Sequence, residues 1–205
     1  MRGSPASTKN IFDKSEGFIG CKRPARRSGA CCAGEVVRLQ TFMSDNPNSP
    51  SNPAEPLFNA ISQTDADFQS AYDRAAETVP QFIEHVESGE DGFYSAKLRF
   101  RDPDESERLG EDRFALIWLT SVHYHAKERI FSGTFFEVPH EFQKWHHVGQ
   151  CLSFEPEDIF DWMVLREGHL HGGFTLRVSR SKRPEAERDS YDRYIGVSVY
   201  EPLPV

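Results

Sequence analysis

The spacing of apolar residues changes at Gly92, and this change constrains the fold more than any other feature of the sequence. Between Asp65 and Ser88 apolar residues recur every three or four positions, which predicts an amphipathic helix. Pro80 should kink that helix or split it near Val79, because proline cannot donate the helical hydrogen bond. Beyond Gly92 apolar and polar residues alternate, which predicts strands. This order predicts an α+β class: one compact domain whose curved, mainly antiparallel sheet packs against an N-terminal helix.

Most of the chain after Gly92 is predicted to form strands separated by short turns. The segment 114–120 is almost wholly apolar, which favours a central strand covered on both faces. The charged segment 104–112 is predicted to be an exposed loop, and 156–163 a helical turn, since Pro156 suits a first helical position. The expected strands are 93–100, 114–120, 130–138, 150–154, 163–166 paired with 174–178, and a short last edge strand within 195–200.

The N-terminal part differs from the rest in composition. Residues 1–42 carry eight Lys or Arg and three Asp or Glu and follow no regular period, so we expect a disordered basic head. Met43 resembles a natural start, and we hypothesise that the native chain begins there. Prolines at every third position then predict a stiff spacer or, alternatively, a polyproline ligand for an aromatic groove. The predicted organisation is a basic head (1–42), a Pro-rich linker (43–63), an α+β domain (64–180) and a polar C-terminal tail (181–205).

The net charge of −8 is unevenly distributed. Because the head contributes +5, the remaining residues must sum to −13. Nucleic-acid affinity rests largely on Lys and Arg that neutralise phosphates, so this acidic body argues against a nucleic-acid partner. No apolar stretch approaches the ~20 residues that span a bilayer, and the N-terminus lacks the apolar region of a signal peptide. We therefore expect a cytoplasmic protein with no membrane partner, and no motif indicates its oligomeric state.

Neither the cysteines nor the histidines follow a strong metal-binding pattern. No CxxC or HExxH spacing occurs, so no cofactor is expected. Cys151 falls in a predicted strand and is expected to be a buried structural thiol. The alternative is a metal site on histidines two positions apart, which would share one face of a strand. Its candidate ligands are His123, His125, His169 and His171.

A carboxylate cluster is the best candidate for acid–base chemistry. Paired carboxylates can divide acid and base roles when their environments separate the pKa values, although a helix start also attracts acids. We expect Asp161 to have a structural role, accepting hydrogen bonds from backbone N–H groups or pairing with Arg177. The cluster consists of Glu155, Glu157, Asp158 and Asp161.

Two glycines follow this cluster and are expected to form a turn. Gly172 and Gly173 lack the context of a phosphate-binding loop, so we interpret them as positions that need a positive φ. The residues after them alternate apolar and polar, so one polar face should emerge from the turn. If the domain has a binding site, we place it where Asp161, Trp162, Thr175 and Arg177 converge.

The order and spacing of several motifs resemble the YegJ-like family of bacterial domains of unknown function (DUF2314). The resemblance covers roughly residues 68–180 and implies a compact α+β domain in the bacterial cytoplasm, with no assigned reaction. One departure is that the Glu that usually lies just before the Trp strand is displaced to Glu111. The closing motifs also resemble, distantly, immunity domains that neutralise toxins. The matching motifs are Lys97–Phe100, Ile117-Trp118, Gly133–Pro139, Gly149, Ile159 with Asp161-Trp162, and Gly172–Arg177.

These features favour a non-enzymatic binding module with a protein partner over an enzyme. No coherent catalytic set of residues appears in the sequence. The alternative is a small hydrolase-like or metal-dependent enzyme that uses Asp161 with Arg177, or the four histidines named above.

Overall fold

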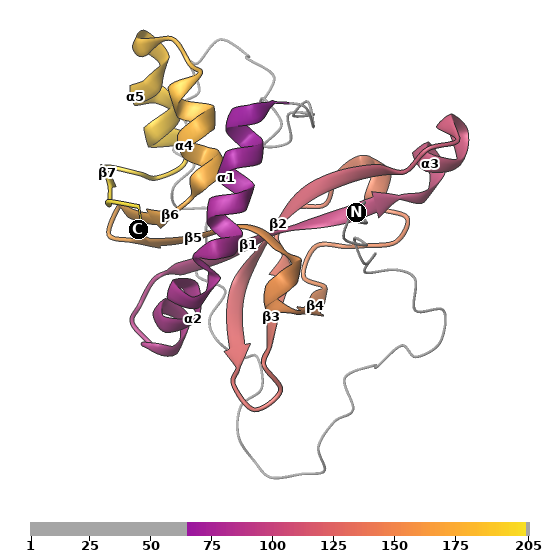
Figure 1. The fold of residues 1–205 in the computed structure, drawn as a ribbon, viewed down its shortest axis with the longest axis horizontal. Coiled ribbons are helices and arrows are strands. Elements are labelled where there is room, and N and C mark those ends of the chain that lie inside the picture. Colours follow the sequence, from indigo (N-terminus) through magenta and orange to yellow (C-terminus); the bar gives the residue numbers. More distant parts are fainter. Residues whose placement is uncertain (1–64, 204–205) are drawn as a thin grey trace, which may run out of the picture. The chain divides into compact units, whose positions relative to one another are not determined.

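A seven-stranded sheet forms the centre of the fold (Figure 1). The computed structural model describes residues 65–203, and the predicted head and linker lie outside them. The strand order is β4-β3-β2-β1-β5-β6-β7, and all neighbours are antiparallel except β6 and β7. The predicted α+β class with a mainly antiparallel sheet is confirmed. The strands are β1 (Phe93–Asp102), β2 (Arg113–His125), β3 (Ile130–Phe135), β4 (Cys151–Phe154), β5 (Ile159–Arg166), β6 (His169–Gly172) and β7 (Val199–Tyr200).

Two helices, α1 (Ala66–Glu77) and α2 (Val79–Glu87), take the place of the one predicted N-terminal helix. The break falls at Thr78, so the predicted effect of Pro80 is confirmed. Pro80 lies in the first turn of α2, where its missing N–H removes no helical hydrogen bond. The hydroxyl of Thr78 closes the end of α1 by donating to the carbonyl of Ala75 at 3.2 Å.

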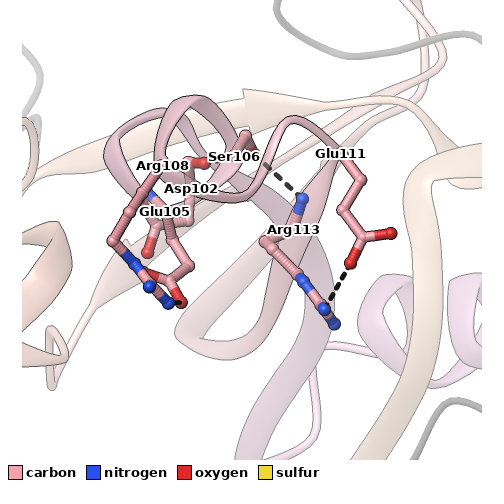
Figure 2. A network of polar contacts seen from close by, with 6 residues as sticks. All are labelled: Asp102, Glu105, Ser106, Arg108, Glu111 and Arg113. Carbon is pink, nitrogen blue, oxygen red and sulfur yellow. Dashed lines mark hydrogen bonds and ion pairs between the residues drawn. The ribbon is translucent and has the colours of Figure 1, made fainter.

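The prediction of an exposed loop at 104–112 is wrong, because a short helix, α3 (Pro103–Leu109), lies there. Asp102 caps this helix by accepting a backbone N–H of the first turn at 2.9 Å. Figure 2 shows how Ser106 joins α3 to the next strand: its hydroxyl accepts the backbone N–H of Arg113 at 2.9 Å. The segment has no apolar stripe, so hydrophobic spacing could not reveal it.

The helical turn predicted for 156–163 is also mostly wrong. Only the 3₁₀ helix η3 (Pro156–Asp158) forms, and the chain then enters β5. The side chains of Glu155 and Asp158 close this single turn reciprocally. Helix formation stops there because the following apolar side chains, including Ile159 and Val164, are buried in the main core as strand residues.

The prediction that 174–178 is a strand paired with 163–166 is wrong. β6 pairs with that part of β5, and the chain then forms the helix α4 (Phe174–Ser181). A further helix, α5 (Glu185–Tyr194), lies in the segment predicted as a polar tail and has no buried residue. The predicted last strand is only β7, which adds to the edge of the sheet in parallel with β6.

The core consists of two clusters of buried apolar residues. The larger cluster joins α1 and α2 to one set of strand side chains and contains Phe82 and Trp162, whose rings stack 5.3 Å apart. The smaller cluster contains Trp118 of β2, Leu170 of β6 and Leu176 of α4. Two buried polar residues of the sheet, Lys97 on β1 and Asp161 on β5, contact α4. Within residues 65–203, no helix is long and apolar enough to cross a membrane.

Candidate functional site

Strand β5 has a strand neighbour on its β6 side along only half of its length. β6 pairs with Met163–Arg166, so among the described residues no strand covers Ile159–Trp162 on that side. The first turn of α4 takes this place, and the backbone N–H of Gly173 donates to the carbonyl of Trp162 at 2.7 Å. The N-terminus of α4 is thereby joined to the edge of the sheet.

Asp161 supplies the cap that α4 lacks in its own sequence. Gly173 stands at the N-cap and has no side chain to accept the first N–H groups of the helix. The carboxylate of Asp161 accepts the backbone N–H groups of Phe174 at 3.1 Å and Thr175 at 2.8 Å. It also accepts the Thr175 hydroxyl at 2.5 Å. A buried negative charge is stabilised at this position because the helix dipole is positive at its N-terminus.

Lys97 provides the opposite charge. It lies directly across from Asp161 in the β1–β5 register, and its Nζ donates to the Thr175 hydroxyl at 2.5 Å. The same Nζ lies 4.6 Å from the ring centroid of Trp118, which adds a cation–π contact. The Thr175 hydroxyl therefore links the ammonium and the carboxylate. We call Lys97, Asp161 and Thr175 the buried triad.

Burial shifts the pKa values of both charged members. It lowers the pKa of Lys97 to about 8, although the charge of Asp161 acts in the opposite direction. Burial also raises the pKa of the Asp161 carboxyl, against the charge of Lys97 and the hydrogen bonds from α4. Such shifts are typical of acid–base residues. However, Asp161, Thr175 and Lys97 are only 0, 1 and 6% exposed, so a substrate could reach them only if α4 moved away.

Trp162 lies next to Asp161 in the chain but points into the main core. Its indole N–H donates to the Thr78 hydroxyl at 3.1 Å, and its ring meets that of Phe174 edge to face. Gly172 has a φ of 67°, and a Cβ atom there would lie 2.5 Å from the carbonyl oxygen of Trp162. The sharp turn into α4 therefore requires glycine at this position.

Arg177, the fourth residue of the predicted binding site, does not pair with Asp161. Its Nε donates to the carbonyl of Gly172 at 2.8 Å, and its Nη2 donates to those of Leu170 at 3.1 Å and Glu201 at 2.6 Å. These bonds tie α4 to β6 and to the segment after β7. The structure thus brings Asp161 and Thr175 together, with Trp162 and Arg177 directed elsewhere.

An open groove of about 240 Å³ lies between α1 and α4, next to Arg177. Arg74 lines the same groove; its guanidinium lies 5.7 Å from the ring centroid of Phe174 and has no acidic partner among the described residues. Burial lowers the pKa of Arg177, and the nearby charge of Arg74 acts in the same direction. The lining residues are Asp67, Ser70, Ala71 and Arg74 of α1, Phe174, Arg177, Val178 and Ser181 of α4, and Leu203.

The four candidate metal ligands are not brought together. His123 and His125 lie on β2, and His169 and His171 on β6, with β1 and β5 between those strands. His171 instead faces His85 of α2, with ring centroids 4.9 Å apart. In the part of the chain that the structure describes, no three His, Cys, Asp or Glu side chains are placed to hold a metal ion.

The other candidates serve local roles or lie at the surface. The carboxylate cluster is divided, because Glu155 and Asp158 close η3 whereas Asp161 is buried under α4. Burial raises the pKa of the Asp158 carboxyl. The expectation of a buried thiol is wrong: Cys151 is exposed on β4.

Sequence reasoning assigned no role to Lys97 or Arg74. Lys97 alternates with the buried Ala96 and Leu98, and a lysine in that pattern normally faces solvent. Its burial depends on Trp118 and on α4, both distant in the sequence, so no local signal predicts it. Arg74 could have been found from its helical spacing, because it shares one face of α1 with Asp67 and Ala71.

Comparisons with known proteins give one family and one relative that matches over a short stretch. A family model described as an uncharacterised protein conserved in bacteria (DUF2314) matches residues 65–199. A putative ankyrin repeat protein of Neisseria meningitidis serogroup B is 33% identical over 54 residues, which cover 26% of this chain. The matched stretch spans only 21% of that relative's length. No solved structure gives a significant match.

Proposed function

Because the chain belongs to DUF2314, an uncharacterised family conserved in bacteria, we propose its function from the site itself: a non-enzymatic protein-interaction module of the cytoplasm. The burial of the triad carries this proposal. Lys97, Asp161 and Thr175 have the greatest potential for acid–base chemistry, yet all three are used to hold α4 against the sheet. These groups thus stabilise the packing of α4 on the sheet.

Two further points support an interaction module. Arg74 and Arg177, the two cationic groups that line the neighbouring groove, are suited to recognition, since guanidinium groups bind planar anions through paired hydrogen bonds. The relative is a putative ankyrin repeat protein, and ankyrin repeats form extended binding surfaces. The distant resemblance of the closing motifs to immunity domains points to the same class of function, neutralisation of another protein by binding.

Affinity capture of the tagged full chain from its own organism tests the proposal. We expect one protein at near-equal stoichiometry with the chain, absent from a parallel capture with the tag alone. Reconstitution of the complex from the two purified proteins, at the same stoichiometry, then shows direct binding. A chain that is repeatedly recovered without a stoichiometric partner would contradict an interaction module.

A second candidate function is an enzyme that uses the buried triad, because a lysine whose pKa is about 8 is partly deprotonated near neutral pH. Such an enzyme would require α4 to move away from the sheet so that a substrate could reach the triad. It would not use the pairing of Asp161 with Arg177 expected from the sequence, because Arg177 binds backbone carbonyls. Turnover of a small molecule by the purified chain, abolished in a folded Lys97→Met variant, would support the enzyme. If a metabolite mixture changes equally after incubation with the wild-type chain and with the Lys97→Met variant, this enzyme is excluded.

A further inference from the structure

The groove between α1 and α4 is formed by matching stripes of side chains on two antiparallel helices. Lys182 at the end of α4 pairs with Asp65 at the start of α1, whereas Arg74 near the end of α1 lies over Phe174 at the start of α4. The helices lie side by side in Figure 1. Ala71 lies between the two ends of α1, so the groove has an apolar middle, and both of its arginines lie toward one end.

The two arginines differ in a way that suits the binding of an anion. Three hydrogen bonds to carbonyls hold the guanidinium of Arg177 in one orientation, and none of them uses its Nη1. Such a fixed donor loses little entropy when it binds a ligand. Arg74 is exposed, and its charge has no acidic partner among the described residues. An anion between the two groups would relieve their repulsion and satisfy both.

The charge of the surrounding domain restricts the class of anion. Residues 65–203 carry 27 acidic and 16 basic side chains, a net charge of −11, which repels a chain of phosphates. Asp67 at the other end of the groove is paired with Lys182 at 2.8 Å, so the charges at that end are already balanced and do not attract a second anion. A single carboxylate next to an apolar side chain fits both restrictions, because Ala71 and Val178 offer apolar contacts beside the arginines.

We propose that this groove binds a short segment of a partner protein that carries one Asp or Glu next to an apolar residue. Arg74 and Arg177 hold the carboxylate, and the apolar side chain packs on Ala71 and Val178. The inference rests on the proposed interaction function and specifies its partner chemistry. In this proposal the groove between α1 and α4 recognises the partner, whereas the buried triad only holds α4 against the sheet.

Selection of random decapeptides displayed on bacteria against the immobilised full chain tests the inference. We expect selected peptides to share an Asp or Glu next to an apolar residue. Fluorescence anisotropy then measures one labelled peptide and its Asp→Asn or Glu→Gln form against wild-type chain, Arg74→Gln and Arg193→Gln. Arg193 is the matched control, because it is exposed on α5 and outside the groove.

Removal of either the peptide acid or the Arg74 guanidinium should weaken binding about tenfold, the loss expected for one charge-assisted hydrogen bond. The two changes together should weaken it little more than one of them, and Arg193→Gln should have no effect. Additive losses, or equal affinity of Arg74→Gln and wild type, would overturn the inference. Displacement of the peptide by a single-stranded oligonucleotide would overturn it as well.

The outcomes also separate this inference from the proposed function. Peptides that bind but show no acidic preference would remove the groove assignment and leave an interaction module in place. A library that yields no binder likewise overturns the groove, because a site of this size recognises a short segment. Only the absence of a stoichiometric partner in the capture experiment counts against the interaction module itself.

Discussion

Replacement of Asp161 by Asn tests whether the buried triad holds α4 in place. The substitution keeps the size of the side chain but removes the charge that balances Lys97. It also puts an NH₂ group among donors that the carboxylate accepts: two backbone N–H groups of α4 and the Thr175 hydroxyl. Removal of one partner from a buried ion pair costs about 3–5 kcal/mol, because the other charge stays buried and unbalanced. For a domain of this size, that loss lowers Tm by roughly 10 °C or more.

Urea unfolding followed by tryptophan fluorescence measures this loss, since Trp162 is fully buried and next to the substituted residue. Asp73→Asn is the matched control, because Asp73 is exposed on α1 and should change stability by less than about 0.5 kcal/mol. The Lys97→Met variant removes the other charge, and the double variant removes both. The double variant should be more stable than the sum of the two losses predicts, by about 1 kcal/mol or more.

Two results would refute this reasoning. An Asp161→Asn variant that unfolds within about 1 kcal/mol of the wild type would show that the carboxylate contributes little as a cap or as a counter-charge. Additive losses in the double variant would show that the charges of Lys97 and Asp161 are not energetically coupled, although they share the Thr175 hydroxyl.

Two further predictions concern stability. Burial lowers the pKa of His85 in the folded state, and the charges of His171 and Arg166 act in the same direction. The pKa of His171 is also lowered, mainly by burial. The folded state then binds fewer protons than the unfolded state, so the contribution of these histidines to stability should be fully present above about pH 6.5 and be lost as the pH falls. In His171→Gln, the midpoint of urea unfolding should depend less steeply on pH over this range. Gly172→Ala should destabilise the domain by about 1–3 kcal/mol more than Gly89→Ala in thermal melts, because both glycines have positive φ but only Gly172 would place a Cβ against Trp162. Equal melting temperatures for the two glycine variants would contradict the close approach.

The sequence predicted the elements whose determinants are local. Pro80 marked the break between α1 and α2, and alternation marked most strands of the antiparallel sheet. Prediction from the sequence failed where the residue that determines the secondary structure of a segment lies far from it in the chain. The segment 174–178 alternates as a strand would, yet it is helical because Asp161 caps it from β5. The helices α3 and α5 were missed for another reason: both are short and polar, and helical spacing of apolar residues cannot identify them.

The same distinction explains what was predicted about the site. Asp161 and Thr175 were expected to converge because they belong to neighbouring motifs, and they form direct hydrogen bonds. Lys97 joins them by donating to Thr175, 78 residues further along the chain. Without Lys97 the acid has no apparent counter-charge, which is why Arg177 was one of its expected partners. With Lys97 in that role, Arg177 is bound to backbone carbonyls at the edge of a groove that it shares with Arg74. The buried lysine thus accounts both for the closed triad and for an arginine that does not pair with Asp161 and instead lines the neighbouring groove.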